Sequence, residues 1–419
     1  MGDDINLYKK TPIIKGTVTL PGSKSISNRL LILKALYPKN ISSIRNISSS
    51  DDTKIIINAL SSSNQVINVE NAGTTMRFLC AFFAVSLKEG QQVDLIGSKR
   101  MEKRPIKELV KALIDLGADI KYLKKEGYPP LRIKGKKIEG GQINLSSHIS
   151  SQFCSALMMI GAKLKGGLRI NLIEDPTSCS YIKMTFNLLK KIGIDISWRN
   201  HVISIKEGIK KKQSSFFVES DWSAASYYYM MASLAKECDL YLNYFKKESL
   251  QGDKKIAFFY KKYFGIETSF KGKMIRLQKK ADFLLPSFLY LDLNNTPDLA
   301  QGIIVNAVAL GIKCHLKGLA TLRVKETDRL EALKKELKKI GVKTLIETHK
   351  RLKDSFKIIG FEKVKKKTFT INTYEDHRMA MSFAPLAIFY PLKIYDFRVV
   401  NKSYPNFWNN LISIGFELT

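Results

Sequence analysis

The 419-residue sequence predicts an α/β protein of two similar domains, each made of three repeated units with buried helices and outer sheets. Three observations lead to this prediction. Six apolar helices recur along the chain, each opening in a polar segment, and an amphipathic helix follows each of them. Short apolar stretches between the helices have the length of strands. Helices this apolar must be buried nearly all round, which leaves the sheets outside. The apolar helices are expected at residues 23–36, 71–85, 150–162, 220–235, 296–310 and 373–389.

Glycines mark the ends of five of the six amphipathic helices. Each follows the last apolar residue, where glycine commonly stops a helix because it adopts the left-handed conformation easily. These glycines are Gly117, Gly193, Gly265, Gly341 and Gly415. Further strands are expected at residues 13–20, 91–96, 131–133, 168–173, 201–205, 275–277, 356–359 and 368–371.

The formal net charge of +31 first suggests nucleic acid or a membrane surface as a partner. The lysines, however, form short clusters in polar linking stretches, and the chain has no long basic arm. The longest apolar runs are too short or too interrupted to span a bilayer. We therefore interpret the charge mainly as a solvated surface, and expect neither nucleic acid nor membrane as a partner.

Five widely spaced cysteines without a CxxC pair indicate reduced thiols, not a disulfide framework or a zinc site. No HExxH or clustered His/Cys pattern is present, so we expect no metal. The chain also opens without a signal-peptide pattern. These features predict a soluble, cytoplasmic protein.

Residues 323–330 concentrate five charges directly before an amphipathic helical pattern. We expect these charges in the first turn of that helix, with Asp328 as a cap. Lys325 and Arg329 oppose the usual preference for anions at this end, and cations added to a helix N-terminus favour an anion-binding site. Taken alone, a solvated surface helix is the more ordinary interpretation.

Other helix openings repeat this design. Residues 21–29 join a strand to the first apolar helix and include Lys24 and Arg29, but Thr17 replaces the earlier glycine that a Walker P-loop needs. The remaining openings contribute Gly73, Arg100, Arg104, Ser150, Ser151, Gln152, Ser178, Tyr181, Asp298, Arg378 and Lys402. Together they predict a cleft for a multiply anionic substrate pair, with Asp298 and Glu326 as acid/base candidates.

These segments resemble the EPSP synthase (3-phosphoshikimate 1-carboxyvinyltransferase) family of enolpyruvyl transferases. The resemblance rests on PGSKSISNR (21–29), NAGTTMR (71–77), RMEKRP (100–105), SSQF (150–153), RVKETDRL (323–330), YEDHRMAM (374–381) and the lysine before SYP (402). It implies an inside-out barrel fold with two domains of three βαβαββ units each. One domain would comprise residues 1–22 and 220–419, the other residues 23–219, with the active site in the cleft between them.

The resemblance also implies a reaction and its residues. The enolpyruvyl group of phosphoenolpyruvate would pass to the 5-hydroxyl of shikimate 3-phosphate through a tetrahedral intermediate, without metal or organic cofactor, in a monomeric enzyme. Asp298 would take the hydroxyl proton and Glu326 would protonate the methylene carbon, with Lys24 and Lys402 as further catalytic residues. Shikimate 3-phosphate would contact Lys24, Ser25, Arg29, Ser150, Ser151, Gln152, Ser178, Tyr181, Asp298, Thr321 and Lys325. Phosphoenolpyruvate would contact Lys24, Gly73, Arg100, Gln152, Arg329, Arg378 and Lys402. Thr321 stands where the family usually has Asn.

Two alternatives stay open at this point. The sister enolpyruvyl transferases that act on UDP-N-acetylglucosamine share the fold, but typically use a mobile-loop cysteine, and residues 100–105 contain none. A basic nucleic-acid-binding protein would need a continuous basic face or an aromatic RNA-binding signature, and the sequence shows neither.

Overall fold

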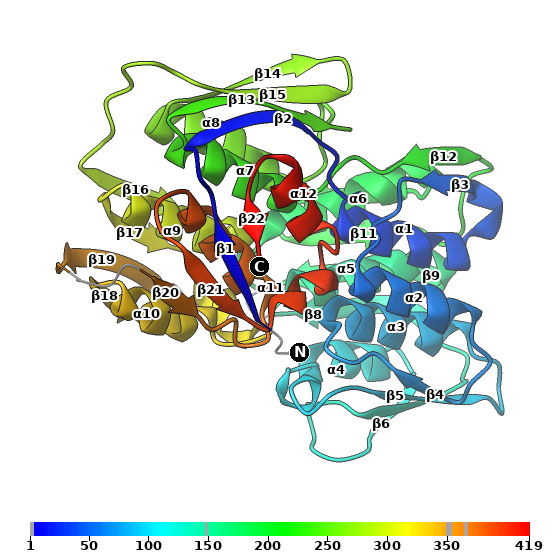
Figure 1. Cartoon of the computed structure of the whole chain (residues 1–419). Helices are drawn as coiled ribbons and strands as arrows, with labels where there is room; N and C mark the ends of the chain where they lie inside the picture. Colours follow the sequence, from blue (N-terminus) through cyan, green and yellow to red (C-terminus); the bar gives the residue numbers. More distant parts are fainter. Residues whose placement is uncertain (1–3, 147–149, 349–353, 364–367) are drawn as a thin grey trace. The chain divides into compact units, whose positions relative to one another are not determined.

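The computed structural model describes residues 4–146, 150–348, 354–363 and 368–419. The chain divides into two compact units: unit 1 comprises Met1–Ser23 and Glu219–Thr419, and unit 2 comprises Lys24–Val218. Figure 1 shows the helices and strands of both units. In the described part of the chain, no helix is both long and apolar enough to cross a membrane. All five cysteines are free.

Unit 1 repeats one sheet pattern three times in its described residues. The strand orders are β14-β15-β13-β2, β16-β17-β19-β18 and β20-β21-β1-β22. Each sheet has one parallel pair and two antiparallel pairs. The strands are β1 (Asp4–Tyr8), β2 (Ile13–Val18), β13 (Glu237–Asn243), β14 (Ile266–Lys271), β15 (Met274–Lys279), β16 (Phe288–Asp292), β17 (Lys313–Lys317), β18 (Val342–Glu347), β19 (Ser355–Phe361), β20 (Phe369–Ile371), β21 (Leu392–Tyr395) and β22 (Glu417–Leu418).

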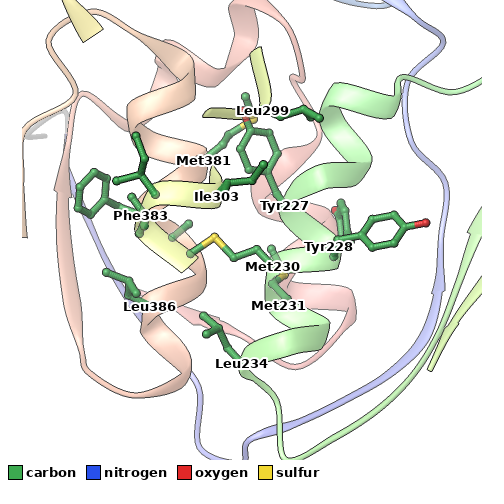
Figure 2. Packing of buried hydrophobic residues seen from close by; sticks show 14 of the residues in the cluster. Tyr227, Tyr228, Met230, Met231, Leu234, Leu299, Ile303, Met381, Phe383 and Leu386 are labelled. Carbon is green, nitrogen blue, oxygen red and sulfur yellow. The ribbon is translucent and has the colours of Figure 1, made fainter. Parts of the chain in front are cut away.

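Three helices, α7 (Trp222–Leu234), α9 (Ala300–Ala309) and α11 (His377–Phe383), are almost completely buried and form the centre of unit 1. In Figure 2, Met230 of α7 points into the same core as Ile303 of α9 and Met381 of α11. Because these helices have apolar residues all round, they are stable only when other elements cover every face. The amphipathic helices are α8 (Lys255–Phe264), α10 (Arg329–Lys339) and α12 (Phe407–Ser413).

Unit 2 uses the same sheet pattern twice, in the orders β4-β5-β7-β6 and β10-β11-β9-β8, and adds the parallel pair β12-β3. Its strands are β3 (Ile41–Arg45), β4 (Val66–Asn68), β5 (Gln92–Ile96), β6 (Asp119–Tyr122), β7 (Leu131–Lys134), β8 (Glu139–Leu145), β9 (Lys165–Leu172), β10 (Ile196–Arg199), β11 (Val202–Ile205) and β12 (Ser214–Phe217). Its helices are α1 (Lys24–Leu36), α2 (Asp51–Ser61), α3 (Gly73–Ser86), α4 (Lys107–Asp115), α5 (Ser151–Ile160) and α6 (Cys179–Ile192).

The six apolar helices and the amphipathic helices that follow them form as predicted, and the five glycine stops all have positive φ. Three apolar helices are shorter than expected, because part of each predicted segment forms a 3-10 helix. The segment 150–162 gives α5 and then the 3-10 helix η3 (Gly161–Lys163). The segment 296–310 begins with the 3-10 helix η5 (Pro297–Leu299) before α9. The segment 373–389 yields α11 and then the 3-10 helix η7 (Ala384–Ile388), which contains Pro385.

Candidate active site

In unit 1 the residues around Arg329 bring several helix openings together. Arg329 is the first residue of α10 and is 2% exposed. Its Nε donates to Asp376 Oδ2 at 2.6 Å, and its Nη2 donates to Glu326 Oε2 at 2.8 Å. Its Nη1 donates to Asp298 Oδ1 at 3.3 Å. Burial on its own would lower the pKa of Arg329, but the three carboxylates outweigh it and raise the pKa. The guanidinium is therefore a fixed cation that orients three acidic groups.

A second arginine shares one of these carboxylates. Nη2 of Arg378, in α11, lies 2.9 Å from Asp298 Oδ2. Nη1 of the same guanidinium donates to the carbonyl oxygen of Asp298 and to Tyr227 Oη, both at 3.3 Å. Lys402 ends the 3-10 helix η8 (Phe397–Lys402), and its Nζ is 3.8 Å from Glu326 Oε1. Five predicted site residues of unit 1 thus form one charged cluster.

Residues 323–330 differ in part from the prediction. The helix α10 begins only at Arg329, so Lys325 and Glu326 lie in the turn before it and not in its first turn. The reason is Asp328, which is the N-cap and accepts hydrogen bonds from the backbone N–H groups of residues 330 and 331. The predicted capping role of Asp328 is therefore confirmed. Thr321 lies in the preceding 3-10 helix η6 (Ala320–Val324), and its Oγ1 is buried without a hydrogen-bond partner among the described residues.

In unit 2 the openings of four helices are linked by hydrogen bonds. Lys24, the first residue of α1, places its Nζ 3.0 Å from Oδ2 of Asp52 in α2. The backbone oxygen of Asp52 accepts a bond from Thr75 Oγ1 of α3. Gln152 Nε2 of α5 donates to Thr74 Oγ1 of α3 at 3.0 Å. Ser150 caps α5 by accepting from the backbone N–H of Gln152. Ser25 and Ser151 occupy the first turns of α1 and α5.

Arg29 is buried beneath this end of unit 2, with 2% of its surface exposed. Its guanidinium donates to Thr185 Oγ1 at 2.7 Å, to the Ser25 carbonyl at 2.9 Å and to Ser155 Oγ at 3.2 Å. It also donates to the carbonyl of Tyr181, and burial lowers its pKa to about 10. These contacts give Arg29 a structural role here. The direct substrate contact that the resemblance implies stays a prediction.

Gly73 makes room for a neighbouring cation. A β-carbon at Gly73 would lie 2.5 Å from Cζ of Arg104, so the absence of a side chain lets this guanidinium pack against the start of α3. Arg104 Nη1 donates to the Asn71 carbonyl at 3.3 Å. Arg100 precedes the short 3-10 helix η2 (Met101–Lys103). Ser178 precedes α6 in the left-handed conformation, at φ 54°, and its side chain does not cap the helix.

Sequence reasoning missed two acidic residues of these clusters. Asp376 caps α11 through the backbone N–H of Arg378 and is also the partner of Arg329. Asp52 pairs with Lys24. Both aspartates stand at the opening of a helical pattern, so their position near the site could have been predicted. Their partners could not, because each partner is distant in sequence. The described residues include no group of three or more His, Cys, Asp or Glu side chains placed to hold a metal ion.

Comparison with known proteins gives one consistent family. The model of the EPSP synthase (3-phosphoshikimate 1-carboxyvinyltransferase) family matches residues 8–63 and 57–411. The 3-phosphoshikimate 1-carboxyvinyltransferase of Bacteroides fragilis (strain YCH46) is 42% identical over 97% of this chain and 96% of its own. The enzyme of the same name from Actinobacillus succinogenes is 34% identical over 96% of this chain and 97% of its own.

Solved structures agree on the fold. EPSP synthase from Acinetobacter baumannii has a TM-score of 0.74 at 21% identity, over 99% of both chains. The enolpyruvyl transferase NikO from Streptomyces tendae has a TM-score of 0.72 at 11% identity, over 100% of this chain and 99% of its own. The predicted fold class is confirmed.

Proposed function

Because the chain belongs to the EPSP synthase family, we propose that it transfers the enolpyruvyl group of phosphoenolpyruvate to the 5-hydroxyl of shikimate 3-phosphate. The products are 5-enolpyruvylshikimate 3-phosphate and inorganic phosphate, as a step of aromatic amino acid biosynthesis. The enzyme acts without metal or organic cofactor, and its partners are these small molecules. We also propose a cytoplasmic monomer.

The observation that carries this proposal is the position of Asp298 and Glu326 on the same buried cation, Arg329. Asp298 is held by two guanidiniums, which favour its ionised form and point it in a fixed direction. An ionised, oriented carboxylate suits a base that receives the proton of the attacking hydroxyl. Glu326 lies between Arg329 and Lys402, which also favour its ionised form. It takes up a proton once the negative charges of the substrates neutralise these cations, and then supplies that proton to the methylene carbon.

The steps balance in atoms and charge. The hydroxyl oxygen bonds to C2 of phosphoenolpyruvate while its proton moves to Asp298 and C3 takes a proton from Glu326. In the second step the bond from C2 to the phosphate oxygen breaks, C3 returns its proton to the Glu326 carboxylate as the C2–C3 double bond forms again, and the proton held by Asp298 leaves with the inorganic phosphate. Arg329, Arg378 and Lys402 supply positive charge for the phosphate and carboxylate groups.

Unit 2 supplies the remaining proposed contacts. Shikimate 3-phosphate is bound by Lys24, Ser25, Arg29, Ser150, Ser151, Gln152, Ser178 and Tyr181, with Thr321 and Lys325 from unit 1. Phosphoenolpyruvate is bound by Lys24, Gly73, Arg100 and Gln152, with the cations of unit 1. Support comes from the hydrogen bonds that join the openings of α1, α2, α3 and α5, because these fix hydroxyl, amide and ammonium groups close together.

Phosphate release from phosphoenolpyruvate tests the proposal, measured with and without shikimate 3-phosphate. We expect release only with shikimate 3-phosphate, together with a product heavier by the enolpyruvyl group. An arm with UDP-N-acetylglucosamine tests the sister activity. Release with this acceptor, and none with shikimate 3-phosphate, would overturn the assignment.

A further inference from the structure

The loop that leads into α11 has a backbone conformation that most residues avoid. It runs from Asn372 to Asp376, between β20 and α11. Tyr374 and Glu375 both lie in the left-handed region, at φ 56° and 55°. Residues with a β-carbon are disfavoured there, so two of them in succession need contacts from elsewhere to hold them. The proposed reaction gives neither residue a role.

Glu336 of α10 supplies such contacts from a side chain that is completely buried. Its Oε1 accepts from Tyr374 Oη at 2.6 Å, and its Oε2 accepts from the backbone N–H of Asn372 at 3.2 Å. Oε2 also lies 2.6 Å from Lys339 Nζ, and this ammonium donates to the Thr370 carbonyl at 3.2 Å. The carboxyl group therefore fixes the loop at two residues, one before the left-handed pair and one within it.

The other end of the loop meets the charged cluster. Asp376 follows the left-handed pair directly, caps α11 by accepting from the backbone N–H of Arg378, and pairs with Arg329. Arg329 and Glu336 are separated by about two turns of α10 and so lie on the same face of that helix. One face of α10 thus holds the loop at both ends, and the loop determines where α11 begins and where Arg378 lies.

We propose that Glu336 is a positioning residue for the binding of phosphoenolpyruvate. It acts through the loop and not by contact with the substrate. Without its hydrogen bonds the left-handed pair relaxes, and the guanidinium of Arg378 moves away from Asp298. The inference rests on the proposed function, in which Arg329 and Arg378 bind phosphoenolpyruvate and shikimate 3-phosphate is bound mainly by unit 2. Loss of the contacts should therefore weaken the binding of one substrate more than that of the other.

The test measures kcat and the KM of each substrate by phosphate release. Tyr374→Phe removes only the hydroxyl that donates to Glu336. We expect its KM for phosphoenolpyruvate to rise on the order of fivefold, less than the full loss of a hydrogen bond to a charged group, because the effect is indirect. The KM for shikimate 3-phosphate should stay within about twofold of the wild type. Glu336→Gln disturbs all the contacts of the carboxyl group, so its effect should be larger in the same direction.

The comparison of the two KM values separates positioning from stability. A smaller folded fraction lowers the apparent kcat and leaves both KM values unchanged. Equal changes in both KM values, or no change in either, overturn the inference. If Glu336→Gln does not fold, Tyr374→Phe decides the question alone.

Tyr8→Phe is the matched control. The Tyr8 hydroxyl donates to Glu417 Oε2, between β1 and β22 of the same unit and outside the charged cluster, and its loss should change neither KM. Amide hydrogen exchange of residues 373–378 gives a second readout, which does not need activity. Exchange should be faster in Tyr374→Phe than in the wild type and unchanged in Tyr8→Phe, and equal rates in all three proteins contradict the inference. A wild type without shikimate 3-phosphate-dependent release instead refutes the proposed reaction, and the role of Glu336 in it, whatever the exchange rates are.

Discussion

Arg329 donates from Nε to Asp376 Oδ2 at 2.6 Å, and both side chains are almost completely buried. This ion pair joins the openings of α10 and α11. The same guanidinium also holds the two carboxylates proposed for proton transfer. The pair is therefore both a structural link and the support of the site.

Removing the guanidinium should destabilise unit 1, because it leaves Asp376 charged and buried. We expect Arg329→Met to cost on the order of 3–5 kcal/mol in the free energy of unfolding. Adding Asp376→Asn should recover part of that loss. Urea unfolding of both single variants and the double variant gives the coupling energy. The more exposed pair Arg276–Asp239 is the control, with an expected coupling below about 1 kcal/mol. Equal coupling energies for the two pairs would contradict the prediction.

Glu326→Gln should lower turnover by on the order of 10²-fold or more, because the amide cannot deliver a proton to carbon. The measurement is phosphate release at saturating substrates. The control is Glu331→Gln, which removes the carboxylate of the third residue of α10. Turnover should stay within about twofold of the wild type, because Glu331 belongs to neither charged cluster. Near-normal turnover in Glu326→Gln would reject the proton-donor role.

The fold was predictable because its signals are local. Helix periodicity, polar openings and terminal glycines such as Gly193 each depend on a few neighbouring residues, and the structure forms them where expected. The cations of the site were also visible, since they cluster in short motifs. What could not be predicted is which side chains meet. Asp376 is 47 residues from Arg329, and only the packing of α10 against α11 brings the two together.

The group that packs against Gly73 also could not be predicted from the sequence. The resemblance implies that phosphoenolpyruvate contacts Gly73, which stays a prediction, and the structure adds that the guanidinium of Arg104 packs beside this glycine. A glycine in a motif indicates that something approaches closely, but not what.

Lys24→Met should lower kcat/KM by about 10- to 10²-fold, the loss of one charge-assisted hydrogen bond to an anionic substrate. The matched control is Lys54→Met. Lys54 pairs with Asp51 on the same helix α2 as Asp52, but the pair is largely exposed. Its loss should change kcat/KM by less than about twofold. Similar losses in both variants would indicate a general effect of surface charge and not a substrate contact.

Gly73→Ala should reduce stability by about 1 kcal/mol, because the guanidinium of Arg104 must move away from the new methyl group and lose its hydrogen bond to the Asn71 carbonyl. Gly302→Ala is the control. Gly302 lies within α9, where an added β-carbon would meet no atom within 4 Å, and alanine should stabilise the helix by up to about 1 kcal/mol. Thermal or urea unfolding separates the two outcomes, which are expected to have opposite signs. A stabilised Gly73→Ala would show that the guanidinium of Arg104 moves aside without cost, and would contradict the prediction.

Asp253 lies in the 3-10 helix η4 (Gly252–Lys254) and is buried, so its ionisation should appear in stability. Burial raises its pKa. Its pKa is about 7 in the folded protein and 3.8 in a solvated aspartate, so the folded state binds the extra proton between these values. Wild-type stability should therefore fall as pH rises from about 4 to 7, relative to Asp253→Asn, which has no such proton. The advantage of the variant should be absent below pH 4 and reach up to about 4 kcal/mol above pH 7. Urea unfolding at pH 4.5, 6 and 8 measures this difference, in which packing effects that do not depend on pH cancel. Parallel stability curves would show that Asp253 keeps one protonation state throughout, and would contradict the prediction.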